Sequence, residues 1–280
     1  MKSIREENDS MKNVCVITGG GSGMGLAAAK CMSKDKIIVV TGRTMAKLEK
    51  AVSELEALGF EAYAKTCDTS VRAQVRELAE YAAGLGTIRN VIHAAGLSPA
   101  MADPEKLIRV NALGTVYVNQ EFSSRMEEGG VIVDVSSNSA YILPEFLVNK
   151  KVFALADTDE EQFLKKILRL PNLLKGYQAS GLAYGLSKKF VIWYAAKCAY
   201  EYGDKKIRVC SLSPGLIATD MGNLEAAEGG DLIRTTAEKR MGTPEELGFA
   251  IASVADERNG YLAGVDILCD GGSVNGKHFI

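Results

Sequence analysis

Tyr184 and Lys188 lie four residues apart at the head of a long apolar segment with a helical pattern. Positions i and i+4 of a helix share one face, so the phenol and the ammonium can point into one cleft. A free tyrosine titrates at about pH 10, too high for proton transfer at neutral pH, and a neighbouring lysine cation favours the phenolate. The pair therefore has the chemistry of a general acid and base.

This spacing does not identify a site by itself, because the chain repeats it at Tyr202 and Lys206. Gly203 follows Tyr202 directly, and we predict that the helix ends there. A solvated surface pair is the alternative interpretation of any single Tyr-x-x-x-Lys. The elements around the pair have to decide between the two interpretations.

A glycine-rich stretch, Thr-Gly-Gly-Gly-Ser-Gly-Met-Gly over residues 18–25, supplies that context. It follows the first apolar strand pattern and opens the first helical pattern. Glycines permit a tight turn there and let backbone amides approach a pyrophosphate at the positive end of a helix. Glycine loops also serve as plain turns, but the strand–loop–helix context indicates dinucleotide binding. The predicted contacts in this stretch are Gly19, Gly21, Ser22, Gly23, Met24 and Gly25.

The end of the second predicted strand indicates which dinucleotide is bound. An acidic residue at that place would bind the adenosine 2′-hydroxyl and repel a 2′-phosphate. Here Gly42 occupies it, Arg43 follows, and Thr44 adds a hydroxyl. A guanidinium suits a phosphate, so we predict NADP(H) in preference to NAD(H). An exposed loop arginine is the alternative.

Composition excludes several other classes of protein. The 280 residues carry a net charge of −2, which gives no indication of a nucleic-acid partner. The first residues are charged and lack the apolar core of a secretory signal, and no apolar run is long enough to span a membrane. The six cysteines are scattered without a Cys-x-x-Cys pair. We therefore expect a reduced, metal-free, cytoplasmic protein.

Apolar strand patterns alternate with helical patterns along the whole chain. This alternation predicts an α/β fold whose parallel sheet is covered by helices on both faces. A polar N-terminal extension of residues 1–11 precedes a single domain of residues 12–280. The expected strands are 14–18, 37–41, 61–65, 90–93, 131–135, 208–213 and 265–269, and the expected helices are 25–32, 45–58, 71–85, 104–125, 182–202 and 244–255.

Residues 140–181 interrupt this alternation, because a short loop would suffice between the fifth strand and the Tyr184 helix. Thr158 to Glu161 has the pattern of a capping box. Four apolar residues then follow at helical spacing. We predict an inserted helix or helix pair beside the sheet, which could serve as a lid, an interface or simple packing. The apolar residues of this helix are Phe163, Leu164, Ile167 and Leu168.

These motifs together resemble the short-chain dehydrogenase/reductase family over about residues 12–272. The resemblance implies a Rossmann-type doubly wound sheet of seven parallel strands. It rests on the glycine stretch, on Tyr184 and Lys188, and on five further matches in the family's order. These matches are Cys67-Asp68, Asn111 in Val-Asn-Ala-Leu-Gly, Ser136-Ser137 at the end of the fifth strand, Ser213-Pro214-Gly215 with Thr219, and Asp270-Gly271-Gly272.

The resemblance implies a catalytic tetrad of Asn111, Ser137, Tyr184 and Lys188. Tyr184 would exchange the proton of the substrate oxygen, and Lys188 would lower its pKa and hold the nicotinamide ribose. Ser137 would bind the substrate oxygen, with Ser139 beside it, and Asn111 would hold a water of a proton relay. Further cofactor contacts implied by the family are Asp68, Thr69, Ala94, Ala95, Gly96, Tyr184, Lys188, Pro214, Gly215, Ile217 and Thr219.

One departure from the family is His93-Ala94-Ala95-Gly96, where Asn-Asn-Ala-Gly is usual. The small Ala-Gly pair that lets the cofactor pass is present. The asparagine that braces the central sheet is absent, and we expect the sheet to do without it. We interpret His93 as a structural rather than a catalytic histidine.

The insertion, with the short link at residues 97–103, resembles a subgroup that contains bacterial 3α-hydroxysteroid dehydrogenase/carbonyl reductase. We therefore expect a small-molecule ketone or alcohol that is hydrophobic or steroid-like as the substrate. A polyol, sugar or 3-oxoacyl substrate is the alternative, as is a protein that senses NADP(H) without turnover. In the family the helices of Asn111 and Tyr184 commonly form the subunit interface. An insertion beside these helices could block or redirect the usual tetramer, so we expect a homodimer, with a tetramer as the alternative. The residues that could wall an apolar pocket are Leu143, Phe146, Leu147, Val152 and Phe153.

Overall fold

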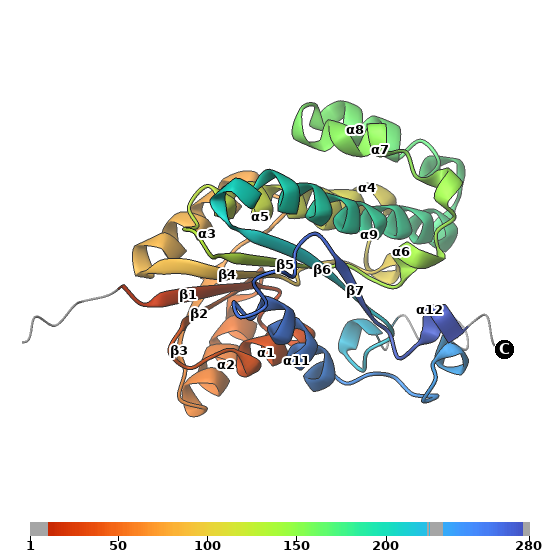
Figure 1. Ribbon diagram of the computed structural model, residues 1–280. Helices are drawn as coiled ribbons and strands as arrows, with labels where there is room; N and C mark the ends of the chain where they lie inside the picture. The colour runs from red at the N-terminus through yellow and green to blue at the C-terminus, as the bar shows by residue number, and fades with distance from the viewer. Residues whose placement is uncertain (1–10, 223, 225–231, 277–280) are drawn as a thin grey trace, which may run out of the picture.

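The computed structural model describes residues 11–222, 224 and 232–276. The predicted N-terminal extension therefore lies almost entirely outside the described residues, as do Gly229 and Gly230 of a loop expected at residues 219–242. A seven-stranded, wholly parallel sheet of order β3-β2-β1-β4-β5-β6-β7 forms the centre, which confirms the predicted fold class (Figure 1). The strands are β1 (Asn13–Thr18), β2 (Ile37–Gly42), β3 (Glu61–Thr66), β4 (Thr87–His93), β5 (Val131–Val135), β6 (Arg208–Pro214) and β7 (Asp266–Cys269).

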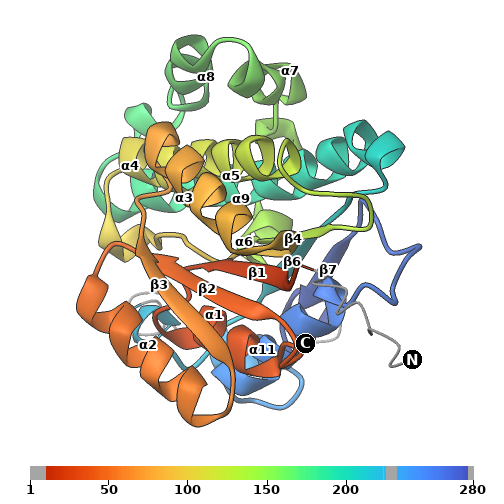
Figure 2. The same ribbon diagram turned by 90° about the vertical axis from the view of Figure 1, so that its left-hand side faces the viewer.

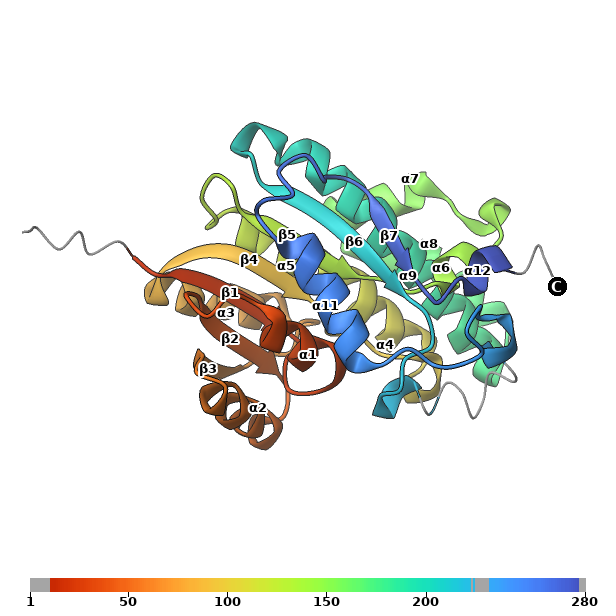
Figure 3. The same cartoon turned by 60° about the horizontal axis from the view of Figure 1, so that its bottom comes forward.

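Helices cover both faces of the sheet, because the central strands are apolar on both sides. One face packs against α1, α2 and α11, and the other against α3, α5 and α9 (Figures 1 and 3). The helices that cover the sheet are α1 (Gly23–Cys31), α2 (Met45–Ala57), α3 (Arg72–Leu85), α4 (Pro104–Ile108), α5 (Gly114–Ser123), α9 (Gly176–Glu201) and α11 (Pro244–Ala255).

The single helix expected over residues 104–125 is interrupted in the structure. Between α4 and α5, residues Arg109–Leu113 form one turn of π-helix that contains Asn111. Such bulges insert one residue into a helix and are frequent at functional sites. Asn111 therefore projects from a distorted turn rather than from a regular helix.

The segment between β5 and α9 folds as a series of short helices, of which α7 and α8 lie on the outer side of α9 (Figure 2). Asp159, rather than Thr158, is the N-cap residue of α8, since its side chain accepts from the Gln162 amide; the capping box predicted there is wrong. The predicted apolar face of this helix is buried. The short helices are α6 (Ser139–Ile142), η3 (Glu145–Leu147), α7 (Lys150–Phe153), η4 (Ala154–Asp157), α8 (Glu160–Ile167) and η5 (Pro171–Leu173).

An aromatic cluster attaches this segment to α9. The Phe153 and Phe163 rings both lie 5.3 Å from the Phe190 ring of α9, and Phe153 also packs on Trp193. All three phenylalanines are fully buried. The part of the segment that holds α7 and α8 is therefore packed onto the helix layer.

Helix α9 begins at Gly176, six residues before the predicted start, and ends at Glu201. Lys206 lies beyond its end with a left-handed backbone, φ 53°. Tyr202 and Lys206 therefore do not share a helix face, as predicted from Gly203. No helix in the described part of the chain is long and apolar enough to cross a membrane.

Candidate active site

The predicted tetrad residues come together at the carboxyl ends of β4 and β5. Lys188 is buried, donates from Nζ to the Val135 carbonyl at 3.0 Å, and lies 5.8 Å from the centre of the Tyr184 ring. The adjacent Ser136 hydroxyl donates to the Lys188 carbonyl at 2.7 Å. The end of β5 thus holds both the backbone and the ammonium of Lys188, which fixes its charge beside the Tyr184 phenol.

Asn111 connects three elements around Lys188. Its side chain accepts from the Leu97 amide at 2.8 Å, and donates to the Leu97 carbonyl at 3.0 Å and to the Ser187 hydroxyl at 3.2 Å. A Cβ atom at Gly96 would lie 3.3 Å from both Asn111 Oδ1 and Lys188 Nζ. Only a glycine leaves this approach open, so the loop after β4 passes directly over the lysine.

A cleft of about 550 Å³ runs along the carboxyl ends of β1, β2 and β4. Its glycine loop is shaped for close backbone approach: Gly19 has a φ of 67°, and a Cβ atom there would lie 2.9 Å from the Ala94 carbonyl. A Cβ atom at Gly25 would lie 2.4 Å from the Gly19 oxygen. The loop therefore packs backbone on backbone at the start of α1, as a dinucleotide pyrophosphate requires.

Most of the predicted cofactor residues line this cleft. They are Gly19, Ser22, Gly23, Met24, Gly25, Arg43, Asp68, Thr69, Ala94, Ala95, Gly96 and Thr219. Sequence reasoning missed other lining residues: Thr18 opens the glycine-rich motif but was not predicted as a contact, and most of the remaining residues stand in no family motif. These are Lys47, Leu97, Met101, Val110, Ala218, Asp220, Met221 and Pro244, among others.

Other predicted cofactor residues do not line the cleft. Gly21 faces α2, where its Cβ position meets Leu48 at 3.2 Å. The Ile217 side chain is buried in the core, so at most its backbone can reach a ligand. Thr44 is the N-cap residue of α2, but its side chain makes no capping hydrogen bond. Gly215 lines a second cavity instead. Pro214 ends β6 as a buried residue.

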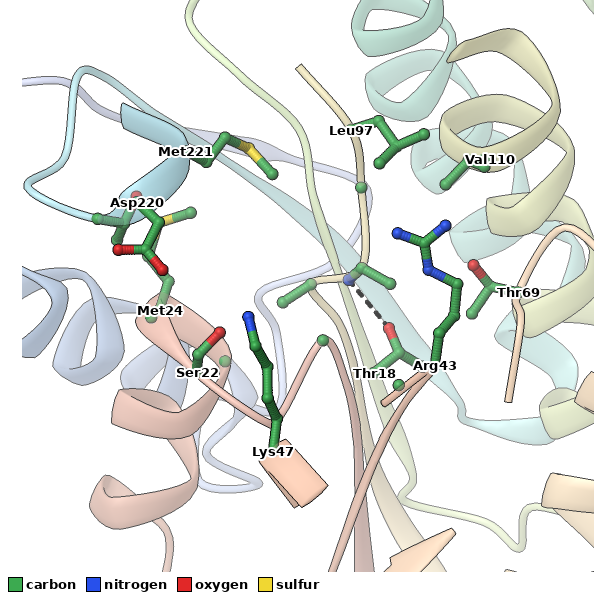
Figure 4. A pocket seen from close by; sticks show the side chains of 18 of the residues that line it. Thr18, Ser22, Met24, Arg43, Lys47, Thr69, Leu97, Val110, Asp220 and Met221 are labelled. Carbon is green, nitrogen blue, oxygen red and sulfur yellow. Dashed lines mark hydrogen bonds between the residues drawn. The ribbon is translucent and has the colours of Figure 1, made fainter. Parts of the chain in front are cut away.

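Two cations line the cleft near the end of β2. Figure 4 shows the Arg43 guanidinium and the Lys47 ammonium pointing into it from the end of β2 and the first turn of α2. Gly42 also lines the cleft and contributes no carboxylate at the end of β2. This corner is electrostatically suited to a phosphate group.

A smaller cavity of about 210 Å³ adjoins Ser137 and Tyr184, and both residues line it. The Ser137 hydroxyl accepts from the Ser139 amide at 3.2 Å, which orients it at the end of β5. The cavity joins apolar and hydroxyl-bearing walls. Its lining is Pro99, Ser137, Asn138, Ser139, Ile142, Tyr177, Gly181, Tyr184, Gly215, Leu216, Thr235, Thr236 and Ser273.

The apolar residues expected to wall a pocket do not line this cavity among the described residues. Phe153 is buried against α9, Leu143 and Val152 pack against the same core, and Phe146 is 86% exposed. Ile142 and Tyr177 supply the apolar wall instead. Tyr177 was missed because α9 was expected to begin after it; on one continuous helix it lies seven residues, two turns, before Tyr184.

Family models and known proteins match this arrangement. A model described as short chain dehydrogenase matches residues 13–146, and one described as enoyl-(acyl carrier protein) reductase matches residues 172–274. The chain belongs to the short-chain dehydrogenase/reductase family. It is an NAD(P)-dependent oxidoreductase of the alcohol dehydrogenase and carbonyl reductase class. The residues between the two matches hold α7 and α8.

The similar proteins support the family without naming one substrate. The chain is 29% identical to the short-chain dehydrogenase/reductase bsc3 of Alternaria brassicicola, over 94% of this chain and 96% of that protein. It is 24% identical to a cyclohexanol dehydrogenase of Acinetobacter sp., covering 94% and 96%. A short chain dehydrogenase of Burkholderia cenocepacia in complex with NADP has the same fold, with a TM-score of 0.74, 22% identity and coverage of 94% and 98%.

His93 takes a bracing role at the position where this family usually has asparagine. Its Nδ1 lies 2.7 Å from the Thr18 hydroxyl of β1, and that hydroxyl accepts from the Ala95 amide at 3.1 Å. The expectation that the sheet lacks a brace here is therefore wrong, because the imidazole spans the same two strands. Burial and the nearby Lys188 ammonium lower the pKa of His93 to about 3, so it stays neutral.

Metal chemistry has no visible basis in the described residues. They contain no group of three or more histidine, cysteine, aspartate or glutamate side chains that could hold an ion. All six cysteines are free thiols, and burial raises the pKa of Cys15, Cys67 and Cys198 to about 12.

Proposed function

We propose that this chain interconverts a secondary alcohol and a ketone with NADP(H), using the tetrad Asn111, Ser137, Tyr184 and Lys188. The observation that carries the proposal is the shared cavity of Ser137 and Tyr184, beside a buried Lys188 that also borders the cofactor cleft at Gly96. When bound, the nicotinamide supplies or accepts the hydride. The protein supplies the proton and holds the substrate oxygen.

Each tetrad residue has a distinct task in this mechanism. The Ser137 hydroxyl donates a hydrogen bond to the substrate oxygen and stabilises the charge that develops there. Tyr184 gives its phenolic proton to that oxygen during reduction and takes it back during oxidation. Lys188 keeps the phenol ionisable, since its cation favours the phenolate. Asn111 fixes the loop after β4, which carries Gly96 between the cofactor and the lysine.

The cation pair at the adenosine end supports NADP(H) rather than NAD(H). A 2′-phosphate placed beside Arg43 and Lys47 gains charge-assisted hydrogen bonds. An adenosine 2′-hydroxyl at the same place meets no carboxylate, because Gly42 stands where one would bind it. The residues therefore favour the phosphorylated cofactor by attraction and offer NAD(H) no specific partner.

The cavity supports a compact substrate with a polar group away from its carbonyl. Its volume of about 210 Å³ lies below the roughly 300–1,000 Å³ of sites for drug-sized ligands. Thr235, Thr236 and Ser273 bring hydroxyls to the lining, while Ile142 and Leu216 are apolar. We therefore favour a small cyclic or hydroxylated ketone over the steroid-like substrate expected from the insertion.

We also propose a homodimer in a reducing, cytoplasmic compartment. The free cysteines support the compartment. The α7–α8 segment (residues 150–167) covers part of α9. Family members associate through this helix, so the cover supports a dimer over a tetramer. Light scattering of the purified protein tests the oligomeric state.

The function is tested by following NADPH absorbance with a panel of ketones and with Tyr184→Phe. The panel holds cyclohexanone, a straight-chain 2-ketone, a ketose, a 3-oxoacyl thioester and a 3-ketosteroid. We expect turnover with a compact ketone, and a loss of several orders of magnitude in kcat for Tyr184→Phe with unchanged NADPH affinity. Near-normal activity of the variant would contradict the assignment of Tyr184. NADPH binding without turnover on any ketone would indicate a sensor protein instead.

A further inference from the structure

Asp134 is a fully buried carboxyl group in β5, three residues before Ser137. It lies beside His93 of β4 and Ser211 of β6 in the sheet register. Both of its oxygens accept from the Asn119 amide of α5, at 2.9 and 3.1 Å. A buried carboxyl group costs free energy unless it is paired, so its presence behind a catalytic site calls for a physical reason.

Asn119 links this carboxyl group to the tetrad through α5. Its amide also donates to the Thr115 carbonyl at 3.0 Å, and the Thr115 hydroxyl donates to the Asn111 carbonyl at 2.7 Å. The four side chains in this series of hydrogen bonds are at most 1% exposed; they are those of Asp134, Asn119, Thr115 and Asn111. Asp134 is therefore connected by hydrogen bonds to the π-turn that carries Asn111.

An amide would satisfy this site better than a carboxylate does. Asn119 Oδ1 is buried and has no hydrogen-bond partner among the described residues. The NH₂ group of an asparagine at position 134 could donate to that oxygen, while its own oxygen accepted from Asn119. A reciprocal amide pair would leave no buried group unsatisfied and would remove the desolvation of a charge. Hydrogen bonding alone therefore does not explain the carboxylate.

The charge around Asp134 comes from α9. Burial raises the pKa of Asp134 to about 7, against the Asn119 hydrogen bond and the Lys188 ammonium, which both favour the ionised form. The Lys188 Nζ donates at 3.0 Å to the carbonyl of Val135, the residue that follows Asp134 in β5. The other titratable groups near Asp134 are His93, its neighbour in the sheet, Cys198 on α9, and Cys210 on the opposite face of β6; all three are neutral at pH 8. At that pH the described surroundings hold one negative charge, on Asp134, near the Lys188 ammonium.

We propose that Asp134 is a positioning residue of the reaction, whose carboxylate acts on Tyr184 through the Lys188 ammonium and sets the pH range of turnover. The proposal rests on the proposed function of the tetrad. A negative charge behind Lys188 stabilises the ammonium and opposes the positive potential that favours the Tyr184 phenolate. Without it, both groups lose their protons at lower pH.

The test is the Asp134→Asn variant, assayed for alcohol oxidation from pH 6 to 10 with the most active alcohol of the panel. We expect both limbs of the profile of kcat/KM to move to lower pH by about one unit, with KM for NADP⁺ unchanged. Restoring the charge on the neighbouring helix, in Asp134→Asn/Asn119→Asp, should move the profile back toward that of the wild type. A profile of Asp134→Asn that superimposes on the wild type overturns the proposal.

Glu121→Gln is the matched control, because it makes the same chemical change at a buried position of α5. Glu121 pairs with Arg72 and Arg76 of α3, away from Lys188, so its variant should keep the wild-type profile. An equal shift in this control would also overturn the proposal.

A readout independent of turnover separates this proposal from the proposed function. The tyrosinate absorbance of wild type minus that of Tyr184→Phe, followed against pH, reports the ionisation of Tyr184 directly. We expect the pKa of Tyr184 from this difference to be lower by the same amount when Asp134→Asn is present in both proteins, with Tyr184 and with Tyr184→Phe. A lower Tyr184 pKa without turnover on any substrate would contradict the proposed function and support the action of Asp134 on Tyr184. Turnover with an unchanged Tyr184 pKa would support the proposed function and contradict the action of Asp134.

Discussion

At the scale of single residues, the cofactor corner shows what the sequence could and could not predict. Arg43 was predicted because it follows a strand end where an acid would bind a ribose hydroxyl. Lys47 was missed, although it lies only four residues further, because its direction depends on how α2 leaves the strand. In the view of Figure 4 the Lys47 ammonium lies between the Arg43 guanidinium on one side and Asp220 and Met221 on the other.

We expect Arg43→Ala to raise the KM for NADPH about 10- to 100-fold and Lys47→Ala about tenfold, with little change for NADH. Each variant removes a charge-assisted hydrogen bond to the 2′-phosphate, and NADH has no such group. Initial rates with both cofactors, at saturating ketone, measure the effect.

Lys50→Ala is the control for these variants, since Lys50 is exposed on the same helix and does not line the cleft. An equal rise in KM for NADPH and NADH in Lys47→Ala would contradict a phosphate contact. An effect of Lys50→Ala as large as that of Lys47→Ala would point to the general charge of α2 instead.

At the scale of elements, every strand was predicted to within a few residues. The signal is continuous for the central strands, which are buried on both faces, and weaker for the edge strand β3, which is partly exposed. The Pro244–Ala255 helix was predicted to the residue, and its capping box is formed by Thr243 and Glu246. The start of α9 was missed because Gly176 and Gly181 are poor helix formers. Burial of Ala179, Ser180 and Ala183 against neighbouring elements overrides that propensity.

The packing of α8 onto α9 can be tested by a substitution at Phe163. We expect Phe163→Ala to lower the free energy of unfolding by about 3 kcal/mol, because a fully buried ring leaves a cavity beside Phe190. The KM for the ketone should stay within about twofold, as no residue of α8 lines the substrate cavity in the described chain. Urea unfolding and initial rates measure the two effects.

Lys165→Ala, on the exposed side of α8, is the control and should change neither quantity. A large rise in KM for Phe163→Ala would show that the segment shapes the substrate cavity after all. The sequence left lid, interface and packing open, and the aromatic contacts favour packing.

At the scale of the whole molecule, two buried groups side by side in the sheet respond oppositely to pH. Burial raises the pKa of Asp134 from 3.8 to about 7, so the folded state holds that proton more strongly and stability falls as pH rises through this range. The pKa of His93 is lowered from 6.5 to about 3, so stability falls as pH decreases through that range. Between about pH 4 and 6.5 the two effects oppose each other.

We therefore expect Asp134→Asn to be more stable than the wild type at pH 8, by up to about 4 kcal/mol, and equally stable at pH 4. The variant lacks the carboxyl whose ionisation disfavours the fold at high pH. Thermal unfolding at several pH values measures the difference. A constant difference from pH 4 to pH 8 would show that Asp134 titrates alike in the folded and unfolded chain.

The α7–α8 segment has a further consequence for how the fold is maintained on dilution. A surface covered by a second subunit becomes exposed when the concentration falls below the dissociation constant. Phe190 is covered by Phe153 and Phe163, which belong to the same polypeptide and therefore cannot dissociate from it. This part of α9 therefore stays out of water at any protein concentration, independently of mass action.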